Sequence, residues 1–119
     1  MALDRFVKFS KKRHPSKQEV ETVLKNFFGS SADVFWNDKT GRFFATLPGT
    51  CTFTFEGIEG AASDPFAGEE RKRWIEVFYD GSVPYLDVIT RSHDEFTNAL
   101  AHRLAEVFAR FWGGEYGDD

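Results

Sequence analysis

The sequence lacks the features that mark an exported, membrane-spanning or disulfide-linked protein. Its 119 residues include one cysteine, Cys51, which cannot form a disulfide within the chain. No apolar run approaches the roughly 20 residues that a membrane-spanning helix needs. Residues 1–9 alternate charged and apolar side chains and lack the apolar stretch of a signal peptide. We therefore expect one cytoplasmic domain over residues 1–119, with no membrane partner, no cofactor and no metal.

Branched aliphatic residues are also scarce, and aromatic residues outnumber them. Leu, Ile and Val together number 17, whereas Phe, Trp and Tyr number 20. One buried aromatic side chain removes about 150–250 Å² from water. A chain of this length can therefore still form a stable core, and with 29% charged residues it has the composition of a globular protein rather than a disordered one.

Two helices are predicted, over residues 17–28 and about 93–112. Ser16 and Glu19 form a capping box at the start of the first helix. Apolar residues then recur at helical spacing until Gly29 ends the pattern. The second helix begins with the same Ser-x-x-Glu pattern and ends at a pair of glycines.

Strands are predicted where apolar and polar residues alternate, and short turn sequences separate most of them. The predicted strands are 3–9, 33–36, 42–47, 50–55, 71–79 and 83–90. Tight turns favour antiparallel pairing, so the sequence predicts an α+β fold with an antiparallel sheet of about five to six strands and both helices packed on one face. Residues 56–70 are predicted to be a long flexible loop and residues 114–119 an acidic tail.

Most aromatic residues fall on the predicted helix stripes or on one face of the sheet, and these should form the core. They are Phe27, Phe28, Phe44, Phe53, Phe55, Phe96, Phe108 and Phe111. Four large rings, Trp74, Phe78, Tyr85 and Trp112, lie outside this set. Because rings of this kind are enriched at the centres of protein interfaces, these four are candidate binding residues.

The last predicted helix offers a second candidate surface. Ala101, Ala105 and Ala109 repeat at intervals of four residues, with Trp112 shortly after them. Small residues allow a second element to approach closely, and the tryptophan could anchor it. We therefore expect a small accessory or inhibitor-type protein that acts by non-covalent binding of a protein partner or by forming a homodimer.

An enzyme or small-molecule-binding protein is the first alternative. A turn centred on Asp80 and Gly81 would place Glu76 opposite Tyr85 and diagonal to Asp87, so that two carboxylates share the open sheet face with aromatic rings. Such a pair could bind a cation or act as an acid and a base. However, the chain lacks a phosphate-binding glycine motif and a nucleophile motif, and we therefore favour a protein without catalytic residues.

Weak nucleic-acid binding is the second alternative. The chain has a net charge of +5 through Lys17 and of −9 after it. The basic side chains between residues 8 and 17 could contact phosphates. They are Lys8, Lys11, Lys12, Arg13 and Lys17. The acidic remainder of the domain would repel a polyanion, so this function is less favoured than protein binding.

Overall fold

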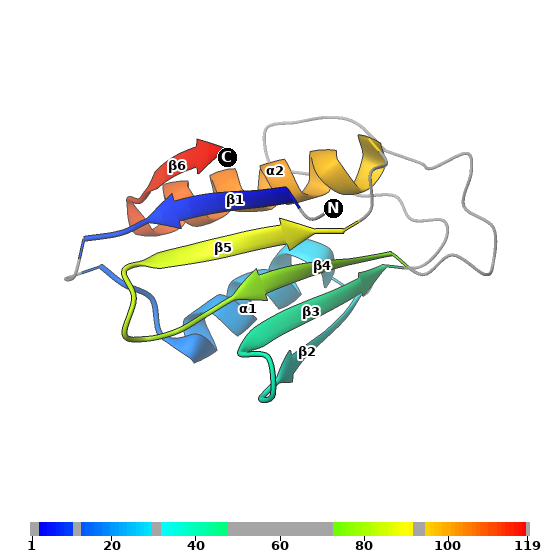
Figure 1. Ribbon diagram of the computed structural model, residues 1–119, viewed down its shortest axis with the longest axis horizontal. Coiled ribbons are helices and arrows are strands. Elements are labelled where there is room, and N and C mark those ends of the chain that lie inside the picture. The colour runs from blue at the N-terminus through cyan, green and yellow to red at the C-terminus, as the bar shows by residue number, and fades with distance from the viewer. Residues whose placement is uncertain (1–2, 11–12, 30–31, 48–72, 92–94, 119) are drawn as a thin grey trace.

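The computed structural model describes residues 3–10, 13–29, 32–47, 73–91 and 95–118. These residues form two helices and six strands, which are labelled in Figure 1. Their order is β1 (Leu3–Lys8), α1 (Lys17–Phe28), β2 (Asp33–Asn37), β3 (Arg42–Leu47), β4 (Arg73–Phe78), β5 (Tyr85–Thr90), α2 (Glu95–Trp112) and β6 (Glu115–Asp118). The predicted strand 50–55, the predicted loop 56–70 and Cys51 lie outside the described residues.

The strands form one antiparallel sheet in the order β2-β3-β4-β5-β1-β6. In Figure 1 both helices lie behind this sheet. Helix α2 packs against β1, β5, β4 and β6, and α1 lies beside β2. The predicted α+β class, with an antiparallel sheet and the helices on one face, is therefore confirmed.

Helix α1 begins and ends where local sequence signals place it. The Ser16 hydroxyl accepts a hydrogen bond from the Glu19 amide at 3.2 Å, and the Glu19 carboxylate accepts one from the Ser16 amide at 3.1 Å. These bonds satisfy backbone donors that have no partner within the helix. At the other end Gly29 adopts a φ of 58°, which is unfavourable for residues with a Cβ atom. Both predicted bounds of this helix are confirmed.

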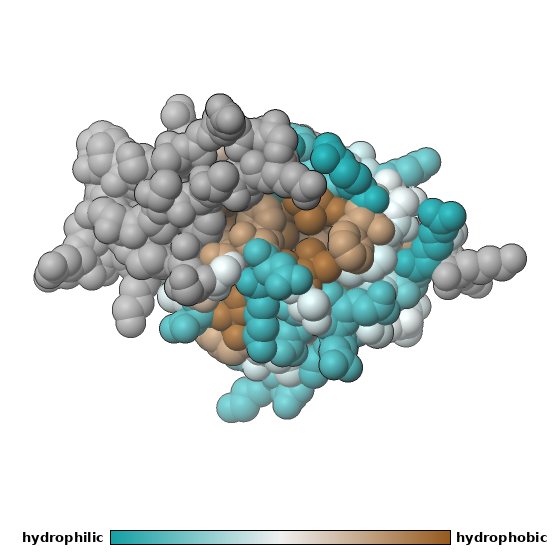
Figure 2. Space-filling view, turned by 180° about the vertical axis from the view of Figure 1, so that it is seen from behind, coloured by the Kyte–Doolittle hydropathy of each residue, from teal (hydrophilic) through white to brown (hydrophobic). Residues whose placement is uncertain are grey.

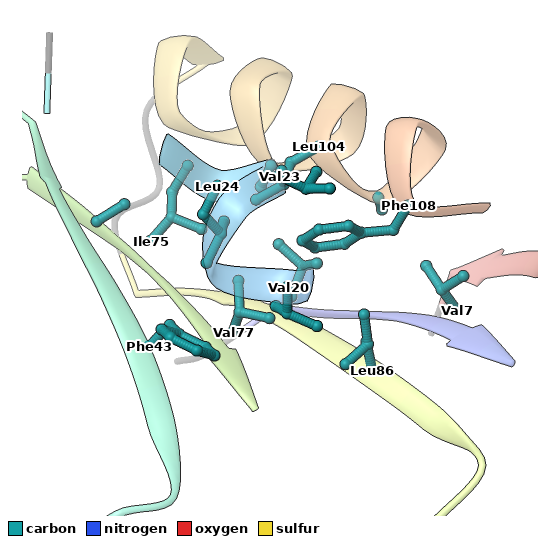
Figure 3. Packing of buried hydrophobic residues seen from close by; sticks show 14 of the residues in the cluster. Val7, Val20, Val23, Leu24, Phe43, Ile75, Val77, Leu86, Leu104 and Phe108 are labelled. Carbon is teal, nitrogen blue, oxygen red and sulfur yellow. The ribbon is translucent and has the colours of Figure 1, made fainter. Parts of the chain in front are cut away.

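The core lies between the sheet and the two helices. Figure 3 shows side chains of β1, β3, β4 and β5 pointing toward the helices. Among the fully buried residues are Val7, Phe43, Ile75, Val77, Leu86, Leu104 and Phe108. Two predicted core rings are placed differently. Phe43 occupies the core and Phe44 faces away from the helices, because adjacent strand residues point to opposite faces. Phe111, near the end of α2, is 66% exposed.

The hairpin of β4 and β5 has a longer turn than the sequence predicted. Glu76 pairs with Ile89 rather than Tyr85. The Asp80 side chain accepts hydrogen bonds from Ser82 within the turn, and the strand resumes only after Pro84, which has no amide hydrogen to donate. The predicted register is therefore wrong, but it differs by an even number of residues, so each side chain stays on its predicted face.

The chain continues beyond α2 as a strand rather than as the predicted tail over residues 114–119. Residues Glu115–Asp118 form β6 and pair with β1. The turn before β6 is tight: a Cβ atom on Gly114 would lie 2.6 Å from the Phe9 ring and 2.9 Å from the Lys8 carbonyl oxygen. Glycine permits this approach, which brings the strand into line with β1.

Candidate functional site

The face of the sheet opposite the helices, called here the open face, collects aromatic side chains from five strands. Pairing aligns Phe35, Phe44 and Glu76 in one row across the sheet. The next row contains Arg42, Phe78, Asp87 and Phe6. The rings on this face are Phe6, Phe35, Phe44, Trp74, Phe78 and Tyr85. Three of them, Trp74, Phe78 and Tyr85, are candidate binding residues from the sequence; the structure places all three on one face, and Phe78 and Tyr85 in contact.

The open-face rings make direct contacts with one another. Phe78 stacks on Tyr85 with centroids 6.2 Å apart, and Phe6 meets Tyr85 edge to face at 5.6 Å. Nearer the other side of the sheet, Phe35 stacks on Phe44 at 5.5 Å. These geometries are favourable for aromatic pairs. Five of the six rings therefore form two preassembled groups on one surface.

A buried carboxylate lies between these two groups. Glu76 is 3% exposed, and its two oxygens accept hydrogen bonds from three side chains. Arg42 Nη1 lies 2.7 Å from Oε1 and Arg91 Nε lies 2.5 Å from Oε2. The Trp74 indole nitrogen donates to Oε2 at 3.0 Å. The carboxylate thus holds two guanidinium groups in fixed positions, and the three charged groups have a net charge of +1.

These contacts keep Glu76 ionised. Burial raises the pKa of the Glu76 carboxyl, but the hydrogen bonds from Arg91, Arg42 and Trp74 outweigh burial and hold the pKa below its ordinary value. In turn, the hydrogen bond to Glu76 and the negative charge of Glu76 raise the pKa of Arg91. A carboxylate in this environment positions its cationic neighbours, and it is poorly suited to donating a proton near neutral pH.

The two arginines also reach the surface. The Arg42 side chain is 27% exposed and that of Arg91 is 48% exposed. The Arg42 Nε is buried and has no hydrogen-bond partner among the described residues. Each guanidinium group carries five N–H donors, of which the carboxylate uses only part. Neither arginine is predicted from the sequence as a site residue. Arg42 lies two residues before Phe44 in β3, and this spacing, which puts both on one face, is the one signal that could have indicated its face.

The third carboxylate-site candidate, Asp87, lies in the row next to Glu76. It is buried, and it pairs with Phe78 of β4 and Phe6 of β1. Because Glu76 pairs with Ile89, Asp87 is still diagonal to Glu76, but on the side of Phe78 rather than of Trp74 as the predicted register implies. Tyr85 lies beyond the end of β4 and contacts the rings of Phe78 and Phe6 rather than Glu76.

The alanine row of α2 lies inside the molecule. Ala101 and Ala105 are fully buried, and Ala109 packs against the core. The Trp112 ring is buried as well, stacked on Phe108 at 5.6 Å and edge to face with Phe9 at 6.0 Å. The small residues therefore allow α2 to approach the sheet of its own chain, and we do not place a partner contact on them.

The basic segment is divided among different surroundings. Lys8 is exposed on β1, and the Lys17 ammonium lies 4.1 Å from the centre of the Trp36 ring. The Arg13 guanidinium lies beside Gly113 at the end of α2, where a cation is favoured by the helix dipole. Lys11 and Lys12 lie outside the described residues. Arg13 and Lys17 thus have contacts within the chain.

The helix side differs in character from the open face. Figure 2 shows this side, with an apolar area next to hydrophilic residues. Within the described residues, no helix is long and apolar enough to cross a membrane, and no group of three His, Cys, Asp or Glu side chains is arranged to hold a metal ion. We take the open face as the candidate site, because it combines aromatic rings with two guanidinium groups that Glu76 holds in place.

Comparisons with known proteins add no family to this description. No protein-family model matches the chain, and neither a characterised protein nor a solved structure shows significant similarity to it. The class of the protein is thus defined by its architecture, an α+β fold with both described helices on one side of an antiparallel sheet.

Proposed function

We propose that this protein acts in the cytoplasm by non-covalent binding of a partner protein to the open face, as an accessory or inhibitor-type protein. The binding surface consists of Trp74, Phe78, Tyr85, Arg42 and Arg91. The observation that carries the proposal is the pair of arginines held by one buried carboxylate among aromatic rings. Trp, Tyr and Arg are the residues most enriched among energetic hot spots of protein interfaces.

The chemistry of the surface indicates an acidic partner. The guanidinium groups of Arg42 and Arg91 are planar and can bind a carboxylate through two parallel hydrogen bonds. Glu76 holds both groups before the partner arrives, so less side-chain entropy is lost on binding. An acidic side chain flanked by apolar residues would then meet the arginines and the rings at once.

The two alternatives are less well supported. An acid and base pair of Glu76 and Asp87 would require Glu76 to exchange a proton, and its hydrogen bonds hold its pKa below the ordinary value. Nucleic-acid binding would require a continuous basic surface, and Lys17 instead lies over Trp36. Neither alternative uses the rings and arginines of the open face together.

The proposal can be tested with peptides selected from a random phage-displayed library on the immobilised protein. We expect enrichment of peptides that combine Asp or Glu with apolar residues. Binding of a selected peptide should weaken about tenfold or more in Arg91→Gln, which removes an interfacial charge. The matched control is Arg110→Gln on the exposed end of α2, which should bind as the wild type does. Equal binding by Arg91→Gln and the wild type would refute the proposal.

A further inference from the structure

The two border strands of the described sheet are β2 and β6. A border strand has backbone N–H and C=O groups on one side that do not take part in the sheet. In Figure 1, β2 lies at the lower border of the sheet, and both helices lie behind the sheet rather than beyond this border. The edge of β2 is thus a candidate for pairing with another strand.

The sequence of β2 carries little of the protection that is usual at a sheet border. Its sequence, Asp33–Asn37, contains no Pro and no Lys, which are the residues that commonly block such edges. At its centre Phe35 is 49% exposed on the open face. Among the described residues only Phe35 and Phe111 are large hydrophobic side chains with this degree of exposure.

We propose that two copies of this chain form a dimer by antiparallel pairing of β2 with β2 of the second copy, around a two-fold axis at Phe35. This register places Phe35 opposite Phe35 of the second copy. It also pairs Val34 with Trp36 of the second copy on the helix side, where both residues are only partly buried in one chain. The two sheets become one continuous sheet, with the helices of both copies on the same side.

The charges of β2 are compatible with this symmetric register. Asp33 lies opposite Asn37 of the second copy, so that no two like charges face each other. The other border behaves differently. A two-fold pairing centred on β6 would place Glu115 opposite Asp118 of the second copy, twice in each dimer. Directly opposed like charges destabilise strand pairs, so the symmetric contact forms at β2 and not at β6.

The dimer does not depend on the proposed binding of a partner protein. Its contact uses the edge of β2, whereas that binding uses Arg42, Arg91 and the rings of β4 and β5. One short strand pair buries a small interface, so we expect a weak, concentration-dependent dimer. An isologous contact also closes at two copies, which distinguishes it from the open chains that a contact between β2 and β6 would produce.

Sedimentation equilibrium over a wide concentration range tests the dimer. The wild type should shift from 13.6 kDa toward twice that mass as its concentration rises. Phe35→Lys places two cations opposite each other at the axis and should raise the dimer dissociation constant at least tenfold. Phe111→Lys alters the other exposed ring and should leave the dissociation constant unchanged. Circular dichroism verifies that both variants fold.

A disulfide test examines the register itself. In a Cys51→Ser background, Phe35→Cys should give a covalent dimer on mild oxidation, because paired strands bring the two residues to the Cα separation of about 4.4–6.8 Å that a disulfide requires. Asp33→Cys should not, because its two copies would be about 13 Å apart along the strands. The proposal would be overturned by any of three results. These are a wild type that stays monomeric at about 1 mM, species larger than a dimer, or equal dimer dissociation constants for Phe35→Lys and Phe111→Lys.

Discussion

The two faces of the sheet use aromatic residues for different purposes. On the helix side, Phe43 and Phe108 are fully buried among aliphatic side chains and fill volume. On the open face, Phe44 and Phe78 are partly exposed and lie beside the ion pairs that Arg42 and Arg91 form with the buried Glu76. The high aromatic content of the chain therefore serves both a close-packed core and a surface, and alternation along each strand separates the two uses.

The helix side should carry most of the folding free energy. Phe108→Ala removes a fully buried ring that stacks on Trp112 and should lower the free energy of unfolding by about 3–5 kcal/mol. Phe111→Ala, three residues later on the same helix, is the matched control. Its ring is 66% exposed, so the change should be within about 0.5 kcal/mol. Urea denaturation measures both, and similar losses in the two variants would contradict the assignment of the core to this side.

The open face should contribute less folding free energy than the helix side, and mainly through its ion pairs. Glu76→Gln removes the anion shared by Arg42 and Arg91 but keeps the shape of the side chain. We expect a loss of about 2 kcal/mol at neutral pH, less than for a fully buried pair because both arginines reach solvent. The control is Glu106→Gln, whose carboxylate pairs with His102 and Arg103 at the surface of α2; its loss should stay under about 1 kcal/mol.

The loss in Glu76→Gln should also depend on pH. Since the pKa of Glu76 is lower in the folded state than its ordinary value of 4.5, its contribution to stability is complete above that value and is lost as the pH falls through the folded-state pKa. The difference in unfolding free energy between the wild type and Glu76→Gln should therefore narrow as the pH is lowered from 7 to about 3. Glu19 and Asp80 also have lowered pKa values, but they are present in both proteins. A difference that stays constant over this range would show that the carboxylate contributes no charge-dependent stability.

The sequence predicted the features of this fold that depend on neighbouring residues. The capping box at Ser16 and the glycine at position 29 are local signals, and they gave both bounds of α1. The register of β4 and β5 depends on how the turn before Pro84 folds, which alternation alone does not reveal. Likewise, alternation separates Phe43 from Phe44 but cannot decide which of the two faces the helices.

The candidate site was only partly predictable for the same reason. Trp74, Phe78 and Tyr85 belong to one hairpin, so their common face follows from alternation and survives the error in register. Arg42 and Arg91 meet at Glu76 because β3 and β5 flank β4, and that strand order is a property of the whole sheet. The local sequence of a strand does not indicate which distant strands will pair with it.

The smallest predicted effect separates the contribution of the Trp74 ring from that of its indole hydrogen bond. Trp74→Phe keeps an aromatic ring at this position but removes the indole donor that lies 3.0 Å from Glu76 Oε2. Because Arg42 and Arg91 still contact the carboxylate, the unfolding free energy should fall by only about 1 kcal/mol, the net value of one hydrogen bond. In Trp74→Phe combined with Glu76→Gln, the loss should be smaller than the sum of the two single losses, since the indole no longer has a charged acceptor. Strict additivity in this double-mutant cycle would mean that Trp74 stabilises the open face through its ring alone.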